Sequence, residues 1–331
     1  MNKILANILI SLLVVTAMLF SACEDKTPES FPANNINGIV QWGAGGGTDS
    51  LMRPLAALAE KELGVAIVVQ NMPGTTGSIA AQYVYDAPAD GYTLLMGAEN
   101  PALYKGLKIS ELTYADFDCL FLLGDETAGI VVGGNSPFNN FTDIVNAALA
   151  KPDSLTLSTT GKGGLPWEVA AFIKDVTGAS FKQIPYDSDA SARNAVLNGE
   201  CDFTVCKVQS GLEHYKAGAL KFLCMFSLAS TPALPQTPPI IAEYPDFARY
   251  LPWGPFYGVF VKQGVSDAVR EVLSGALVHA ALDDGYQEIL ANFNINFLGL
   301  SGVKAWEYID AWQTNTLQAL SNSGALEEYD R

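Results

Sequence analysis

Short apolar segments alternate with amphipathic ones in this chain, and that alternation constrains the fold more than any other feature. In the first block, the helical pattern of Leu51–Leu63 lies between two apolar runs and is followed by Gly64, a residue that often ends a helix. Strands that alternate with helices are typical of α/β proteins with a largely parallel sheet. The expected strands of this block are Ile39–Trp42, Ala66–Gln70, Tyr92–Met96 and Phe117–Leu123, with a second helix over Ile79–Tyr85.

The same alternation returns in a second block that begins near Leu155. Pro166–Thr177 and Asp189–Leu197 both carry a helical pattern, and glycine follows each of them closely. Two successive blocks of this kind predict two similar α/β lobes. The strands expected in the second block are Leu155–Thr159, Phe181–Tyr186, Cys201–Cys206 and Lys221–Phe226.

A proline-rich stretch, Ser230–Pro255, follows the second block. It cannot form one regular element, because proline fixes φ and lacks an N–H group. We interpret it as the long connection back to the first lobe, which a strand at Phe256–Val261 and helices at Ser266–Ala280 and Val303–Ala319 then complete. The expected domains are residues 36–132 plus 254–331 for lobe 1, and residues 133–253 for lobe 2.

The N-terminus has the pattern of an export signal. Lys3 precedes an apolar stretch over residues 4–22, and small residues come just before Cys23. The tetrapeptide Phe20–Cys23 resembles a bacterial lipoprotein signal, which implies that residues 1–22 are removed and that Cys23 carries a lipid anchor outside the cytoplasm. A plain signal peptide and a transmembrane anchor are the alternatives. Residues 23–35 are polar and contain proline, as expected for a flexible tether.

The charge balance excludes one class of partner. The chain has 19 basic and 35 acidic side chains and a net charge of −16. Nucleic acid is therefore not expected as a partner, because phosphate binding requires a basic surface. A small anion is not excluded, since it responds to local dipoles more than to net charge.

Four cysteines beyond the signal lie in apolar runs: Cys119, Cys201, Cys206 and Cys224. An exported protein can form disulfides, but a free cysteine also behaves as a small apolar side chain, and the spacing does not decide between the two. The chain has no C-x-x-C motif, so we expect no structural zinc site.

A glycine-rich segment, Val40–Ser50, joins the first expected strand to the first expected helix. Glycine lets the backbone approach a ligand, and a helix N-terminus carries unpaired N–H groups and a partial positive charge. An anion therefore fits there without any basic side chain, although such a loop alone is a weak signal. The candidate contacts are Gly45, Gly46, Gly47 and Thr48. Asp49 belongs to the same site but is expected to cap the helix, since its charge repels a carboxylate.

At this point the chain resembles the substrate-binding proteins of tripartite tricarboxylate transporters, the Bug family of extracytoplasmic receptors. The resemblance covers nearly the whole chain after the tether, and it depends on the order and spacing of several motifs rather than on any one of them. These are VQWGAGGGTD at 40–49, VVQNMPGTTGSIAAQYV at 68–84, PADGYTLLMG at 88–97, NPALYKGL at 100–107, STTGKGG at 158–164, IPYDSDASARNAVLNGECDF at 184–203 and WGPFYGVFV at 253–261.

This resemblance implies a type II periplasmic-binding-protein fold, in which two α/β lobes close on a small carboxylate and deliver it to membrane permease subunits. It implies no cofactor, no metal and no catalysis. The carboxylate would be held by backbone N–H groups and hydroxyls of two glycine loops, one in each lobe. The second loop comprises Thr159, Thr160, Gly161, Lys162, Gly163 and Gly164. Trp42, Ala98 and Tyr186 are further candidates for the pocket, and for Trp42 and Tyr186 a packing role is the alternative.

Two charged residues near the expected cleft have open roles. The loop after Gly97 is shorter than is usual in the family, and it brings Glu99 close to the strand end. Glu99 is expected in solvent; the alternative is that it faces the cleft, where it would suit a ligand with an amine or hydroxyl group. Arg193 is expected on a solvated helix face, with pairing to a second carboxylate as the alternative.

Other functional classes fit the sequence less well. The loop GAGGGT lacks the third glycine of a dinucleotide site, and no acid stands where it would bind a ribose. No G-x-S-x-G or H-E-x-x-H motif is present, and two isolated histidines offer little for acid–base catalysis. A secreted hydrolase is therefore a distant alternative. A binding protein that feeds a membrane signalling partner is a nearer one, and the sequence does not separate it from a transporter receptor.

Overall fold

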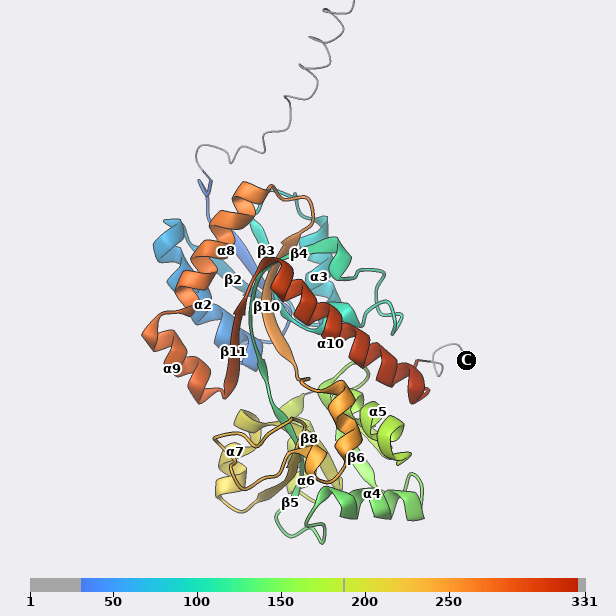
Figure 1. The fold of residues 1–331 in the computed structure, drawn as a ribbon. Helices are drawn as coiled ribbons and strands as arrows, with labels where there is room; N and C mark the ends of the chain where they lie inside the picture. Colours follow the sequence, from blue (N-terminus) through green and yellow to red (C-terminus); the bar gives the residue numbers. More distant parts are fainter. Residues whose placement is uncertain (1–30, 187, 327–331) are drawn as a thin grey trace, which may run out of the picture.

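The computed structural model describes residues 31–186 and 188–326, which form two α/β lobes around separate sheets (Figure 1). The first sheet has the strand order β11-β4-β10-β3-β1-β2, and the second has the order β7-β6-β8-β5-β9. The strands of the first sheet are β1 (Ile36–Val40), β2 (Ile67–Asn71), β3 (Thr93–Ala98), β4 (Phe117–Glu126), β10 (Phe256–Lys262) and β11 (Ile295–Leu300).

Helices cover both faces of the first sheet. One face packs on α2 (Gly47–Leu63), α8 (Asp267–Ala281) and α9 (Asp284–Asn292), and their apolar side chains form one buried cluster. The other face packs on α3 (Ser78–Asp86) and α10 (Gly302–Asn322). Short 3₁₀ segments complete the lobe: η1 (Thr75–Gly77), η2 (Asn100–Ala102) and η3 (Tyr114–Asp116).

The second lobe follows the same plan. Its strands are β5 (Ala128–Gly133), β6 (Thr156–Thr159), β7 (Lys182–Pro185), β8 (Phe203–Lys207) and β9 (Leu220–Met225). Its helices are α4 (Phe141–Ala150), α5 (Leu165–Thr177), α6 (Asp189–Leu197) and α7 (Val208–Lys216). The proline-rich connection that follows contains only the 3₁₀ segments η4 (Ile240–Ala242) and η5 (Pro245–Tyr250), as its composition predicts.

Both sheets are mixed, so the expectation of largely parallel sheets is wrong. β1 pairs in parallel with β2 and β3, and β6 pairs in parallel with β7 and β8. The strands that connect the lobes run against their neighbours: β10 is antiparallel to β3 and β4, and β5 is antiparallel to β8 and β9. Apolar periodicity identifies a buried strand but carries no information on its direction.

The chain leaves the first sheet at Thr127, between β4 and β5, and not after residue 132 as the sequence predicted. The buried run continues from β4 into β5, so the apolar pattern hides the crossing. The two crossing segments lie side by side, since the N–H of Glu126 donates to the carbonyl of Pro255 at 2.9 Å. Lobe 2 is therefore inserted into lobe 1 through two adjacent chain segments.

One apolar cluster is continuous across the lobes, and α10 reaches from lobe 1 to α5 of lobe 2 (Figure 1). Trp253 and Trp312 stack with ring centroids 5.8 Å apart. Their indole N–H groups donate to Thr316 Oγ1 and to the carbonyl of Gly254, both at 2.8 Å. The lobes are thus joined by packing on the α10 side of the crossing segments.

Gly254→Ala should lower the free energy of unfolding by about 1–3 kcal/mol, because overpacking moves backbone. A Cβ at Gly254 would lie 2.5 Å from the backbone oxygen of Glu126. Gly275→Ala in α8 is the control, because no described atom lies within 4 Å of its Cβ position. This change should raise the free energy of unfolding by up to about 1 kcal/mol. Urea unfolding measures both, and a Gly254→Ala variant as stable as the wild type would show that the crossing segments separate without cost.

The structure decides the state of the four cysteines. Cys119, Cys201, Cys206 and Cys224 are all buried and free, so the disulfide alternative is not realised. Within residues 31–186 and 188–326, no helix is both long and apolar enough to span a bilayer. The expected signal peptide and Cys23 lie outside the described residues.

Candidate functional site

The carboxyl ends of the parallel strands in both lobes meet between the lobes. In lobe 1, β1 leads into α2; in lobe 2, β6, β7 and β8 lead into α5, α6 and α7. Ligands of α/β proteins bind at this edge of a sheet, where helix N-termini also point. The arrangement therefore brings the first glycine loop (Gly43–Asp49) and the second glycine loop (Thr159–Gly164) to the same boundary, as the sequence predicts for two loops in different lobes.

The first glycine loop presents the N-terminus of α2. Gly45 has φ of 75°, a conformation that favours glycine, and Gly46 is the extended N-cap. The N–H of Ser50 is the first to bond back within the helix, to Gly46 at 2.9 Å, so the N–H groups of Gly47, Thr48 and Asp49 lie outside the helical ladder. A Cβ at Gly47 would lie 3.5 Å from the hydroxyl of Tyr257, so this helix end faces the crossing strand β10.

Asp49 has a different role from the expected N-cap. Gly46 is the N-cap, and the Asp49 carboxylate accepts from the N–H of Gly45 at 3.0 Å and from Arg53 at 2.6 Å. Burial opposes ionisation, but hydrogen bonds from Arg53, Gly45 and Asn71 hold the pKa of Asp49 below its usual value. Asp49 therefore fixes the shape of the loop, and the Gly45 N–H that it binds is engaged within the loop.

The second glycine loop offers fewer donors than the sequence suggests. The N–H of Gly161 donates to Thr159 Oγ1 at 3.2 Å, and the N–H of Gly164 donates to the Gly161 carbonyl at 3.2 Å. Pro166 has no N–H to offer in the first turn of α5. The hydroxyl of Thr160 lies close to Gly164, where an added Cβ would be only 2.2 Å away. Several polar groups of this loop therefore form hydrogen bonds within the loop itself and are not available to a ligand.

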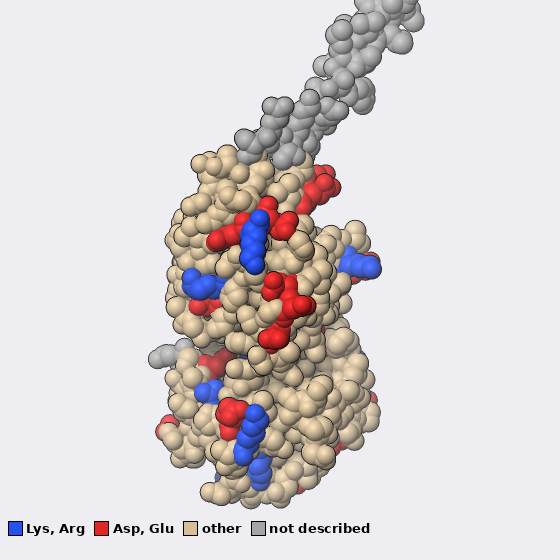
Figure 2. Space-filling model, turned by 90° about the vertical axis from the view of Figure 1, so that its left-hand side faces the viewer, with Lys and Arg blue, Asp and Glu red and all other residues tan. Residues whose placement is uncertain are grey.

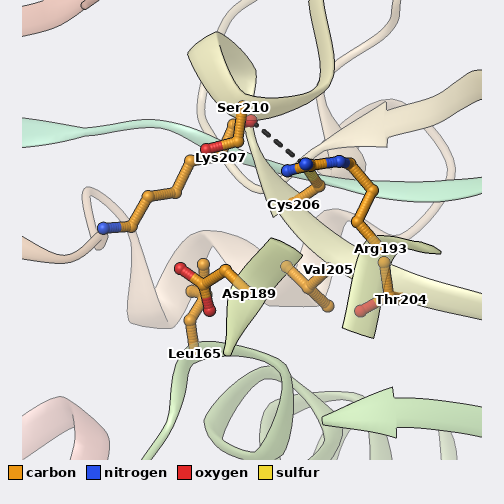
Figure 3. Close-up of a pocket in the computed structure, with 8 residues that line it drawn as sticks. All are labelled: Leu165, Asp189, Arg193, Thr204, Val205, Cys206, Lys207 and Ser210. Atoms are coloured by element: carbon orange, nitrogen blue, oxygen red, sulfur yellow. Dashed lines mark hydrogen bonds between the residues drawn. The ribbon is translucent and has the colours of Figure 1, made fainter. Parts of the chain in front are cut away.

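A cavity in lobe 2 opens at the ends of β8, α6 and α7 (Figure 3). Figure 3 shows the side chains of Asp189 and Lys207 pointing toward its left-hand side and Arg193 reaching in from the other side. The residues that line it are Leu165, Asp189, Arg193, Thr204, Val205, Cys206, Lys207 and Ser210. This cavity places two cations beside the N-termini of α5 and α6.

Lys207 is one of the charged residues that the sequence analysis missed. Its ammonium donates to the hydroxyl of Tyr257 at 2.9 Å and lies 3.7 Å from Glu126 Oε2, while Tyr257 donates to the same oxygen at 2.6 Å. Burial would lower the pKa of Lys207, but Tyr257, Glu126 and Asp189 raise it well above its ordinary value. The lysine thus stays charged at the lobe boundary. Its position directly after the predicted strand Cys201–Cys206 was the signal that could have identified it.

Arg193 does not lie on a solvated helix face, so that expectation is wrong. The residue is partly buried and lines the cavity, and its Nε makes no hydrogen bond to any described residue. Its guanidinium lies beside the Cys206 thiol, where its charge partly offsets the effect of burial, which raises the pKa of that thiol to about 12. The helical pattern of α6 located Arg193 on the helix but did not show that β8 would cover it.

Lys162 stands apart from the cavity that contains Lys207. It is exposed and lines a separate groove with Lys174 and Gln183. The structure therefore does not bring Lys162 together with Lys207 and the α2 N-terminus. Gly163 instead contacts lobe 1, since a Cβ there would lie 2.9 Å from Leu107 Cδ1.

The remaining binding-site candidates from the sequence lie either in packed positions or at the ends of strands and helices. Tyr186 packs against a small apolar cluster and its hydroxyl lies 3.6 Å from Cys201 Sγ, which favours the packing alternative. Trp42 is partly buried, and its carbonyl accepts from Asn71 at 2.9 Å. Ala98 pairs with Tyr257 between β3 and β10, and Thr48 is buried at the start of α2.

Glu99 is buried, so the expectation that it lies in solvent is wrong. Only 7% of the residue is exposed. Burial raises the pKa of Glu99 to about 7, and the charge of Lys207 opposes that shift. The neighbouring Asn100 accepts from Gln41 at 2.7 Å and donates to the Gly163 carbonyl at 3.5 Å, so this segment links the strand end of β1 to the second glycine loop.

No group of three or more histidine, cysteine, aspartate or glutamate side chains that could hold a metal ion is found within the described ranges. On the face shown in Figure 2, acidic and basic side chains are sparse and interspersed, without a continuous basic surface.

Comparison with known proteins places these features in context. A family model described as "Tripartite tricarboxylate transporter family receptor" matches residues 51–315. Among curated relatives, the protein BugT of Bordetella pertussis is 26% identical over 280 residues, which is 83% of this chain and 83% of that protein. A protein encoded between tcbD and tcbE in Pseudomonas sp. strain P51 is 26% identical over 86% of this chain and 85% of its own length.

Solved structures share the fold. The periplasmic binding protein BugD has a TM-score of 0.77 and 23% sequence identity, with 89% of this chain and 99% of that chain covered. MatC of Rhodopseudomonas palustris, solved with bound malate, has a TM-score of 0.72 and 20% identity over 89% of this chain and 99% of its own. The two-lobed α/β architecture is therefore that of periplasmic binding proteins of this type.

Proposed function

We propose, from the premise that this chain belongs to the tripartite tricarboxylate transporter receptor family, that it captures a small carboxylate between its lobes and delivers it to a membrane permease. The family and the fold are those of solute-binding receptors. Binding without turnover is accordingly part of the proposal. Anchoring by a lipid on Cys23 is a further part, because it would keep the receptor close to its permease.

The observation that carries this proposal is the meeting of a helix N-terminus and a partly buried cation at the lobe boundary. Gly47 begins α2 and faces the Tyr257 hydroxyl, which would lie 3.5 Å from a Cβ added at Gly47 and which accepts a hydrogen bond from Lys207. A carboxylate at this point would accept from the backbone N–H groups of Gly47 and Thr48, favoured by the helix dipole. Lys207 would supply the charge, and a charge-assisted hydrogen bond of this kind is stronger than a neutral one.

Arg193 and the N-terminus of α6 extend this surface into lobe 2, so the ligand would be in contact with both lobes. The ligands of two structural neighbours are compatible with such a site: MatC was solved with malate and another Rhodopseudomonas palustris protein with adipate. Both are small dicarboxylates. The carboxylate class is proposed from the family and from these neighbours, and the contact residues are proposed from this chain's own geometry.

A small carboxylate should raise the unfolding temperature of the protein, and a thermal-shift screen that includes malate and adipate tests this. Binding to the native state alone stabilises it by about 2.7 kcal/mol at a hundredfold excess over Kd. The matched control is the diamide of each acid, which keeps the shape but not the charge. A screen in which no carboxylate shifts the transition, or in which a diamide shifts it equally, would contradict the proposed site. Recovery of a chemically altered acid would contradict binding without turnover.

A further inference from the structure

A groove in lobe 2 has no part in the proposed function, although it borders the second glycine loop. It lies between α5 and β7 and encloses about 530 Å³, a size typical of sites for small organic ligands. Neither Lys207 nor Arg193 lines it, so it is separate from the cavity at the end of β8. We call it the α5–β7 groove, and the side chains that define it are Lys162, Trp167, Ala170, Lys174, Phe181 and Gln183.

Local structure explains why the α5–β7 groove is not filled by the protein itself. β7 is an edge strand of the second sheet, and α5 packs on β6 and β8. The chain turns from α5 into β7 through Gly178, Ala179 and Ser180, whose side chains are too small to cover the strand. Gln183 and Pro185 of β7 are therefore exposed.

The floor of the groove is apolar and well packed. Trp167, Ala170 and Lys174 are spaced by three and four positions, so they lie on one face of α5. Phe181 and Gln183 are two positions apart, so their side chains point to the same side of the edge strand. Trp167 and Phe181 are only 9% and 8% exposed, and Ala170 is buried. A floor of this kind suits the apolar part of a ligand.

Positive charge borders the apolar floor. Lys162 lies at the glycine-loop end, beside the N-terminus of α5, whose dipole also favours an anion. Lys174 lies in the last turn of α5, and Asp153 is the one acidic residue among those that line the groove. Two lysines and one aspartate give the groove a charge of +1, whereas the whole chain has −16. The groove is thus complementary to an anion that also has apolar surface.

We propose that the α5–β7 groove is a second binding site, for an organic carboxylate that carries a bulky apolar group. The carboxylate lies at the Lys162 end, and the apolar group covers Trp167, Ala170 and Phe181. Small dicarboxylates such as malate lack this apolar group, so the groove and the lobe boundary select different acids. The proposed transport role does not enter this inference.

A strand from another protein fits this position less well than a small ligand. The N–H groups of Lys182 and Tyr186 donate to β6, so the backbone of Gln183 and Pro185 faces the open edge. Pro185 has no N–H group with which to extend a sheet. The groove is therefore assigned to a small ligand, and an acidic peptide is included in the test.

Calorimetric titration of the protein with 3-cyclohexylpropanoate tests the proposal. The acid should bind saturably to the wild type, and the corresponding uncharged amide should bind more weakly. Gln183→Trp should weaken binding at least about tenfold, because a larger side chain at this exposed strand position occupies the groove while the fold is kept. Lys182→Trp is the matched control: its side chain points to the opposite face of β7, so affinity should stay within about threefold of the wild type.

Two further variants locate the ligand within the groove. Lys162→Met should weaken binding of the cyclohexyl acid up to about fivefold, as expected for an exposed charge, and should leave the affinity for malate or adipate unchanged. Binding should also change the tryptophan fluorescence of the wild type. That change should be absent in Trp167→Phe, which keeps an apolar floor and should keep the affinity within about threefold.

Four outcomes would contradict the proposal. The first is the absence of saturable binding, and the second is equal binding of the acid and its amide. The third is wild-type affinity in Gln183→Trp, or displacement of the cyclohexyl acid by adipate, since either result would place this acid outside the groove. The fourth is tighter binding of a short polyglutamate peptide than of the cyclohexyl acid, with loss of that binding in Gln183→Trp, which would make the groove a peptide site.

Discussion

Lys207→Met should lower the free energy of unfolding by about 3–5 kcal/mol at pH 8, because it leaves a buried carboxylate without its counter-charge. Glu126 is only 3% exposed and has Lys207 and Tyr257 as its polar neighbours. Burial already raises the pKa of Glu126, and the charge of Lys207 opposes that shift. Without the lysine the folded state binds a proton that the unfolded chain releases, so stability is regained as pH falls. The deficit should therefore shrink toward pH 5, which urea unfolding at both pH values measures.

Two further variants separate charge from packing. The double variant Lys207→Met with Glu126→Gln lacks both charges, so it should recover much of the lost stability. It should still bind carboxylates more weakly than the wild type, because the lysine is absent. Lys162→Met removes an exposed lysine from the separate groove, and it should change neither stability nor affinity by more than about 0.5 kcal/mol. A Lys207→Met deficit of equal size at pH 5 and pH 8 would show that Glu126 is not left charged. Loss of binding in Lys162→Met alone would move the site to the second glycine loop.

Gly47→Leu should weaken carboxylate binding at least about a hundredfold, or roughly 2.7 kcal/mol, while the fold is kept. Gly47 is helical, so a side chain meets no backbone strain, and its Cβ would stand 3.5 Å from the Tyr257 hydroxyl in ordinary contact. A leucine extends beyond that point into the space beside Tyr257. Calorimetric titration with the acid that gives the largest thermal shift measures the loss.

The control for this variant comes from the same loop. Gly43→Leu places the same side chain where no described atom lies within 4 Å, and it should leave affinity within about threefold of the wild type. Gly46 is less suitable, because a Cβ there would lie 3.1 Å from the Gly43 carbonyl and would disturb the loop itself. Wild-type affinity in Gly47→Leu would mean that the ligand does not reach the start of α2.

Helices with strong periodicity and a clear stop were predictable. The helix expected at Asp189–Leu197 has those bounds in α6, and the one expected up to Leu63 ends at Gly64, whose φ is 70°. Here local sequence and tertiary packing favour the same structure. The crossing at Thr127 was not predictable in this way. An uninterrupted apolar run is compatible with one long strand or with two strands in different sheets.

The candidate site was only partly visible in the sequence. The glycine loops could be located in the sequence because glycine marks positions where the backbone turns sharply or can approach a ligand; their role in binding stays a prediction. Lys207, Glu126 and Tyr257 were missed because their contact exists only in the folded protein, and Tyr257 is 131 positions from Glu126. Glu99 and Arg193 were wrongly expected in solvent. The local sequence shows where each residue lies along its own loop or helix, but it does not show which other elements pack over that residue in the folded protein.

The insertion of lobe 2 between β4 and β10 also bears on the order in which the protein folds. These strands pair although about 130 residues separate them, and closing so long a loop costs conformational entropy. The second sheet uses only segments of residues 128–225, and its completion brings the ends of the insertion together at Glu126 and Pro255. Once lobe 2 has folded, it holds the ends of β4 and β10 close together and so reduces the entropy cost of pairing these two strands. Lobe 2 should accordingly acquire protection from hydrogen exchange first, and β10 and β11 should acquire it last.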